Sequence, residues 1–144
     1  DKLVTGVQTC ALPISLILIA EDNETNIKTI WDYLLSKGYR LILAKNGWEA
    51  ISQAKEYHPQ LIMMDIQMPD MDGIEAIKRI RDNQETSEIP IIAVTALAMP
   101  GDKEKCLGAG ADEYISKPVS LKNLVSTIQK YVHVEVKDLQ LVSS

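Results

Sequence analysis

Short apolar runs alternate along this chain with longer stretches in which apolar residues recur every three or four positions. The runs, such as LILIA at 16–20 and LIMM at 61–64, suit strands buried on both faces of a parallel sheet. The longer stretches have the spacing of a single helix face. The pattern predicts five strands, at 16–20, 40–44, 61–65, 90–94 and 113–116, and five helices, at 24–37, 48–57, 73–82, 101–107 and 121–131.

Residues that begin or end regular structure fall between these elements. Gly38, Pro59 and the GAG sequence at 108–110 follow three of the helices, and Ser120 precedes the last helix as an N-cap. Strands and helices that alternate over such short connections form a parallel sheet with right-handed crossovers and helices on both faces. We therefore expect a single α/β domain with a doubly wound sheet.

Composition narrows the class of protein further. The 144 residues are 46% hydrophobic and 24% charged, with a net charge of −5, so nonspecific binding to nucleic acid or to an anionic membrane is disfavoured. No apolar run approaches the roughly 20 residues that span a bilayer. The two cysteines, Cys10 and Cys106, have neither disulfide-framework nor zinc-site spacing, which favours a reducing cytoplasm.

The sequence of the N-terminus indicates a different origin from the rest of the chain. The sequence VTGVQTCALPI at 4–14 resembles the translation of a common sequencing-library adapter. We predict that residues 1–15 are adapter-derived and exclude them from fold reasoning, with residues 16–131 as the domain and 132–144 as a C-terminal tail. Cys10 is then not a native residue, and the native sequence upstream of Leu16 is missing.

Polar residues follow the apolar runs at the points where the predicted strands end. They are the pair Glu21-Asp22, then Asp65, Thr95 and Lys117. Ligands of open parallel sheets bind outside the carboxyl ends of the strands, and these ends share one edge. We therefore expect three carboxylates, a hydroxyl and an ammonium to gather there.

Three carboxylates close together raise each other's pKa unless a counter-charge is present. A divalent cation would supply it, and an all-oxygen site favours Mg²⁺, or Mn²⁺, over zinc. The expected ligands are Asp22, Asp65 and the backbone carbonyl of Gln67, with Glu21 acting through water. A solvated acidic turn is the alternative for Glu21 and Asp22 taken alone.

Metal, ammonium and hydroxyl together match the needs of a transferring phosphoryl group, which are charge neutralisation and donors for its oxygens. Asp65 would then be the nucleophile and form a mixed anhydride. Lys117 precedes Pro118, and a cis bond there would fix the loop that aims the amine. A plain salt bridge for Lys117 and an ordinary strand position for Thr95 remain the alternatives.

Four spaced motifs resemble those of the receiver domains of two-component response regulators. They are EDN at 21–23, MDIQMPDMDG at 64–73, VTALA at 94–98 and KP at 117–118. The resemblance covers about Leu16 to Tyr131 and is nearest to single-domain regulators of the chemotaxis and cell-division kind and to receivers of hybrid histidine kinases. It implies a flavodoxin-like (βα)5 fold with strand order 2-1-3-4-5.

The resemblance also implies a role for each strand-end residue. Asp65 would accept a phosphoryl group from the phosphohistidine of a histidine kinase or histidine phosphotransfer protein, with Mg²⁺ required. Glu21 and Asp22 would hold the metal, and Thr95 and Lys117 would bind the phosphoryl oxygens. The domain would be no enzyme beyond catalysing its own phosphorylation and slow dephosphorylation, and would contact neither nucleic acid nor membrane.

Signal output and phosphate lifetime are likewise implied by the resemblance. Phosphorylation would draw Thr95 toward the phosphate and let Tyr114, the aromatic switch, rotate inward, which reshapes the surface of the fourth helix, fifth strand and fifth helix for a downstream protein target. Gln67 and Leu97 occupy the positions that tune phosphate lifetime. Leu97 cannot hold an attacking water by hydrogen bonds, so we predict slow self-hydrolysis.

Other readings of the same residues remain open at this point. A haloacid-dehalogenase-like phosphatase also uses an aspartyl nucleophile with magnesium, but it would need an acid two residues after Asp65, where the chain has Gln67. A flavodoxin-like electron carrier would need a phosphate cradle after the first strand, and an EF-hand ligand series at 70–73 is incomplete. A phosphorylation-independent interaction module is the third alternative.

Overall fold

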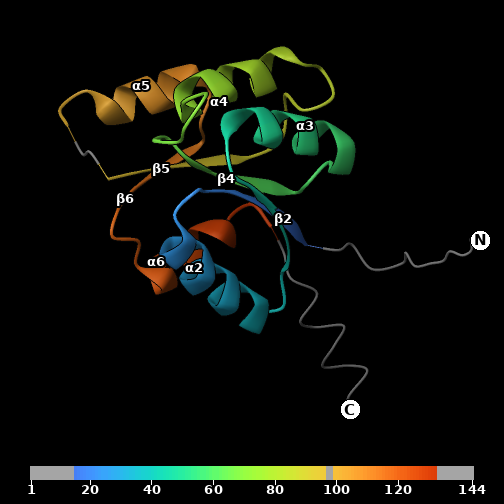
Figure 1. Ribbon diagram of the computed structural model, residues 1–144, viewed down its shortest axis with the longest axis vertical. Helices are drawn as coiled ribbons and strands as arrows, with labels where there is room; N and C mark the ends of the chain where they lie inside the picture. The colour runs from blue at the N-terminus through green and yellow to red at the C-terminus, as the bar shows by residue number, and fades with distance from the viewer. Residues whose placement is uncertain (1–14, 97–98, 133–144) are drawn as a thin grey trace, which may run out of the picture.

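The computed structural model describes residues 15–96 and 99–132. Five strands and five helices alternate along these residues (Figure 1). The strands are β2 (Leu16–Ala20), β3 (Arg40–Ala44), β4 (Leu61–Asp65), β5 (Ile91–Thr95) and β6 (Glu113–Ser116). The helices are α2 (Glu24–Ser36), α3 (Gly47–Tyr57), α4 (Gly73–Asp82), α5 (Asp102–Ala109) and α6 (Leu121–Ile128).

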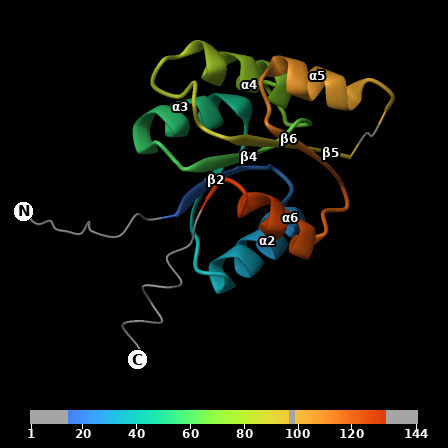
Figure 2. The same ribbon diagram turned by 180° about the vertical axis from the view of Figure 1, so that it is seen from behind.

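All five strands form one parallel sheet in the order β3-β2-β4-β5-β6, which is the predicted order 2-1-3-4-5 when the strands are counted along the chain. Helices α3, α4 and α5 cover one face of the sheet, and α2 and α6 cover the other (Figures 1 and 2). The fold class predicted from the hydrophobic pattern is therefore confirmed.

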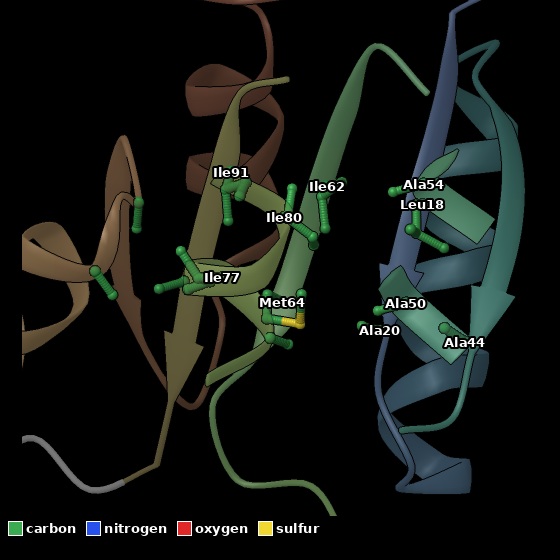
Figure 3. Close-up of a cluster of buried hydrophobic side chains, with 14 of the residues drawn as sticks. Leu18, Ala20, Ala44, Ala50, Ala54, Ile62, Met64, Ile77, Ile80 and Ile91 are labelled. Carbon is green, nitrogen blue, oxygen red and sulfur yellow. The ribbon is translucent and has the colours of Figure 1, made fainter. Parts of the chain in front are cut away.

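Each face of the sheet carries its own hydrophobic core. Figure 3 shows the core under α3 and α4, where Ala50, Ala54, Ile77 and Ile80 meet residues of the central strands such as Met64. The second core packs α2 and α6 against the opposite face, and its fully buried side chains include Ile17, Ile19, Leu34, Leu61, Met63 and Ile92. Side chains of one strand alternate between the two cores, so strands β2, β4 and β5 read as continuous apolar runs in the sequence.

Polar side chains cap four of the helices. Asn23, Asn46, Asp72 and Ser120 each accept a hydrogen bond from the backbone N–H three residues further on. The cap at Ser120 was predicted, and all five helix starts lie within one residue of the predicted ones. Helix α6 ends at Ile128 instead of continuing to residue 131, and β5 includes Thr95.

Arg81, at the end of α4, joins several segments at the edge of the sheet opposite to the carboxyl ends of the strands. Its Nε donates to the Gly110 carbonyl at 2.9 Å, and Nη1 donates to the carbonyls of Ser87 and Ile89 at 3.1 and 2.7 Å. Its Nη2 pairs with Asp112 Oδ2 at 2.9 Å. Gly110 has φ of +124°, and a Cβ there would lie 2.6 Å from Arg81 Cγ. Only glycine therefore fits beneath this arginine.

Parts of three predictions fall outside the described residues. They are the adapter-derived segment apart from Ser15, the C-terminal tail apart from Val132, and Leu97. The Ser15 carbonyl accepts a hydrogen bond from Arg40 N, and Val132 is buried in the second core. Over the described ranges, no helix combines the length and apolarity that crossing a membrane requires.

Candidate functional site

The ends of four strands bring the candidate residues to one edge of the sheet. Glu21 follows β2, Asp65 and Thr95 are the last residues of β4 and β5, and Lys117 follows β6. The register aligns them, because Asp65 pairs with Val94 and Thr95 pairs with Ser116. The structure thus brings together the five polar residues that the strand ends predicted, while their roles stay predictions.

Glu21, Asp22 and Asp65 form a carboxylate cluster. One oxygen of each lies within 4.8 Å of the others. Glu21 and Asp65 are 0% and 2% exposed, whereas Asp22 is exposed to solvent. Two acidic side chains are therefore buried next to each other, and the third acid of the cluster, Asp22, lies at the protein surface.

The Lys117 ammonium bridges the two buried carboxylates. Its Nζ lies 3.1 Å from Glu21 Oε1 and 3.1 Å from Asp65 Oδ2. The contact with Asp65 is a hydrogen bond, whereas the contact with Glu21 is an ion pair without hydrogen-bond geometry. The peptide bond between Lys117 and Pro118 is cis. One cation thus serves two buried acids, which leaves the site net negative.

Backbone amides hold the other oxygens of the two buried acids. Asn23 N–H donates to Glu21 Oε2 at 3.1 Å, and Gln67 N–H donates to Asp65 Oδ1 at 3.0 Å. Each donor lies two residues after its acid, so the loop that leaves the strand folds back over the carboxylate. The side chain of Gln67 itself is exposed.

Burial has the largest effect on the pKa of Asp65. It raises the pKa of Asp65 to about 6 from 3.8, with Glu21 adding to the rise, while the Gln67 amide and the Lys117 charge oppose it. Burial alone would lower the pKa of Lys117, but the negative charges of Asp65 and Glu21 raise it overall. Lys117 therefore stays charged while Asp65 ionises near neutral pH.

Gly73 lets the loop after β4 pack tightly against the site. Its N–H donates to the Ile66 carbonyl at 2.9 Å. A Cβ at this position would lie 2.6 Å from the Asp65 carbonyl oxygen and 2.7 Å from Ile66 Cα, both of which are backbone atoms. The sequence predicted Gly73 only as a helix start, and this close approach had no local sequence signal.

Thr95 and Tyr114 lie on the side of the site that faces α5. Thr95 is 1% exposed, and Tyr114 is half-buried against the core under α3, α4 and α5. The Tyr114 hydroxyl donates to Asp102 Oδ2, in the first turn of α5, at 3.4 Å. Sequence reasoning missed Asp102, because its approach to Tyr114 depends on how α5 is placed over β6.

The residues at this edge suit a hard divalent cation. The donor set is all oxygen, and Glu21 Oε1 is buried with no hydrogen-bond partner among the residues that the structure describes. Two buried acids against one ammonium leave a negative charge uncompensated. An all-oxygen, net negative site fits Mg²⁺.

Comparisons with known proteins point to one family. A model of the response regulator receiver domain matches residues 17–129. Over 116 residues, 81% of the chain and 94% of the relative, the sequence is 45% identical to the polar-differentiation response regulator DivK of Brucella ovis.

Solved structures of the same kind share the fold. The receiver domain of sensor histidine kinase PA1611 from Pseudomonas aeruginosa PAO1, which has a magnesium ion coordinated in its active site cleft, is 37% identical with a TM-score of 0.77 over 83% of this chain and 98% of that one. A co-crystal structure of the Saccharomyces cerevisiae histidine phosphotransfer protein Ypd1 and the receiver domain of Ssk1 matches at 36% identity and a TM-score of 0.75, over 83% of this chain and 89% of that one.

Proposed function

Because the chain belongs to the response regulator receiver domain family, and so is a signalling domain of two-component systems, we propose that Asp65 receives the signal as an aspartyl phosphate. Members of this family are signalling proteins, which separates the chain from the phosphatase and electron-carrier alternatives.

The observation that carries the proposal is the setting of the Asp65 carboxylate. One oxygen accepts from the Gln67 amide and the other from the Lys117 ammonium, 3.0 and 3.1 Å away. These two donors fix the orientation of a carboxylate that is 2% exposed. A fixed, desolvated carboxylate that ionises near neutral pH is suited to attack an electrophilic phosphorus atom.

The reaction exchanges one bond to phosphorus for another. A carboxylate oxygen of Asp65 forms the new P–O bond as the P–N bond to a histidine of the donor breaks, and the imidazole leaves with the electron pair. Lys117 stays close enough to neutralise a phosphoryl oxygen, since its ammonium already lies 3.1 Å from Asp65 Oδ2. Thr95, buried at the neighbouring strand end, supplies a hydroxyl donor for another oxygen.

Asp22, Asp65 and the Gln67 backbone carbonyl would hold Mg²⁺, or Mn²⁺ as the alternative, with Glu21 reaching it through water. When bound, the cation neutralises negative charge that the cluster and the phosphoryl group bring together. The exposed position of Asp22 supports this assignment, because it leaves the cluster open to an incoming ion.

The phosphodonor would be a histidine kinase or a histidine phosphotransfer protein. The likeness to the Ssk1 receiver, solved together with the phosphotransfer protein Ypd1, supports this class of partner. A small cleft lined by Asn26, Thr29 and Pro118 adjoins Lys117 and gives such a partner a place to approach the site.

Output would follow from Thr95 and Tyr114. Movement of Thr95 toward the phosphate lets Tyr114 turn inward and changes the surface formed by α5, β6 and α6, to which a downstream protein binds. Gln67 and Leu97 tune the lifetime of the phosphate. The domain phosphorylates itself from small donors such as acetyl phosphate and hydrolyses the product slowly.

The test uses the full chain with Mg²⁺ and beryllofluoride, followed by two-dimensional NMR of the backbone amides. We expect shifts centred on Asp65, Thr95 and Lys117, and mass spectrometry after incubation with acetyl phosphate should show one added phosphoryl group. Asp65→Asn should abolish both responses, whereas Asp70→Asn, in the exposed part of the same loop, should retain them. An unresponsive wild type, or an unchanged response in Asp65→Asn, refutes the proposal.

A further inference from the structure

The hydroxyl of Tyr114 is fixed to the helix that follows the Thr95 strand. It donates to Asp102 Oδ2 at 3.4 Å, and Asp102 is the first residue of α5. Burial raises the pKa of the Tyr114 hydroxyl most, a hydrogen bond with Ser116 opposes the rise, and the charge and hydrogen bond of Asp102 add to it. The pKa is raised overall, so the hydroxyl keeps its proton and remains a donor. Tyr114 therefore has a polar partner in the first turn of α5.

Thr95 and Tyr114 belong to the same face of the sheet. Tyr114 pairs with Ala93 across β5 and β6, and Thr95 pairs with Ser116 two positions further along both strands. Because side chains on one strand return to the same face every second residue, Ala93 and Thr95 share a face, and so do Tyr114 and Ser116. Ala93 and Tyr114 both pack in the core under α5.

The hydrogen bond also spans the segment that links the two groups along the chain. Residues 96–101 run from Thr95 to Asp102, the N-terminal residue of α5. Lys117 N–H donates to the Thr95 carbonyl at 2.8 Å and ties the start of this segment to the end of β6. The Asp102–Tyr114 bond joins the first residue of α5 to the same strand, β6.

From this geometry we infer that Asp102 is a positioning residue, which holds Tyr114 in the position that the structure shows and so opposes the switch until Asp65 is phosphorylated. The inference rests on the proposed function of Asp65 and Tyr114. The bond stabilises the resting arrangement, and it must break before the ring turns inward. It therefore adds to the free energy that phosphorylation has to supply, and it lowers the resting population of the active arrangement.

The test is a beryllofluoride titration of the full chain in excess Mg²⁺, read by NMR, for a double-mutant cycle of Asp102→Ala and Tyr114→Phe. Asp102→Ala should lower the beryllofluoride concentration at half-saturation by about two- to five-fold, as expected for loss of one long hydrogen bond to a carboxylate. Tyr114→Phe, which removes only the hydroxyl, should give a similar shift, and the double variant should add nothing further.

Glu104→Ala is the matched control, because Glu104 is the other acid in the first turn of α5 and is exposed. It removes the same charge from the helix N-terminus and should leave the titration unchanged. Asp102→Asn keeps an oxygen acceptor and should shift it less than Asp102→Ala, which provides a second variant if alanine destabilises α5.

The outcomes separate this inference from the function on which it rests. An unresponsive wild type refutes the phosphoacceptor role itself. If the wild type responds but Asp102→Ala titrates like it or like Glu104→Ala, the positioning role is wrong. The positioning role is also wrong if Asp102→Ala shifts the half-saturating beryllofluoride concentration equally in the wild type and in Tyr114→Phe, because the effect then does not depend on the hydroxyl.

Discussion

Replacing Asp65 by asparagine should stabilise the metal-free protein at neutral pH, although it removes the reactive group. Asp65 is 2% exposed, and its pKa is raised from 3.8 to about 6. The folded state therefore binds this proton more tightly than the unfolded state does. The contribution of Asp65 to the free energy of unfolding is greatest below about pH 4 and falls as the pH rises through 6.

The size of the effect follows from the shift in pKa. A difference of roughly two units corresponds to a cost on the order of 3 kcal/mol for keeping the carboxylate ionised in the folded protein. Asparagine has nearly the same shape, keeps an oxygen for the Gln67 amide and never ionises. The gain is reduced by the lost attraction to Lys117, so we expect Asp65→Asn to be more stable by about 1 to 3 kcal/mol at about pH 7.5.

Urea unfolding in EDTA, followed by circular dichroism, measures this difference. The gain should shrink as the pH falls from about 6 and approach zero below about pH 4, where Asp65 is protonated in both the folded and the unfolded wild type. Addition of Mg²⁺ should raise the urea midpoint of the wild type more than that of Asp65→Asn. Asp22→Asn removes an equal charge from an exposed position and should change the metal-free midpoint much less. A destabilised Asp65→Asn, or a gain that persists at low pH, would refute the reasoning.

Three further substitutions test other parts of the site. Lys117→Met should lower the free energy of unfolding by about 3 kcal/mol at neutral pH, because Glu21 and Asp65 lose their shared counter-charge; an unchanged urea midpoint would contradict this. Gly73→Ala should cost about 1 to 3 kcal/mol and weaken Mg²⁺ binding in calorimetry, since its Cβ would press on the Asp65 carbonyl, and wild-type values for both would be evidence against this close packing. Leu97→Asn should shorten the half-life of the acyl phosphate, measured by mass spectrometry, and an equal half-life would count against the predicted role of Leu97.

The sequence predicted the architecture because the signals that define it are local. A run of apolar residues identifies a buried strand, and the first polar residue after it identifies the strand end. In a parallel sheet those ends share an edge, so Glu21, Asp65, Thr95 and Lys117 could be placed together before any distance was known. The strand order needed more than this pattern and came from the resemblance to receiver domains.

Contacts between side chains from different elements were beyond the sequence. It could not show that Lys117 pairs with Glu21 as well as with Asp65, because that depends on the loop geometry after β6. Nor could it show that Asp102 contacts Tyr114, since a shift of α5 by one helical turn relative to β6 would separate the two side chains. Such pairs depend on distances between elements, and hydrophobic periodicity carries no information about those distances.

The hydrogen bond between Arg81 and Gly110 makes the C-terminal end of α5 the fixed end of the helix. The N-terminal end continues into the segment from Thr95. A rotation about Gly110 would keep this bond, and a tilt of about 10° would move Asp102 by roughly 2 Å, because α5 is roughly 12 Å long. In such a rotation the displacement decreases along α5 toward Gly110. Under the proposed function, a partner protein that binds the first turn of α5 would therefore meet the largest displacement.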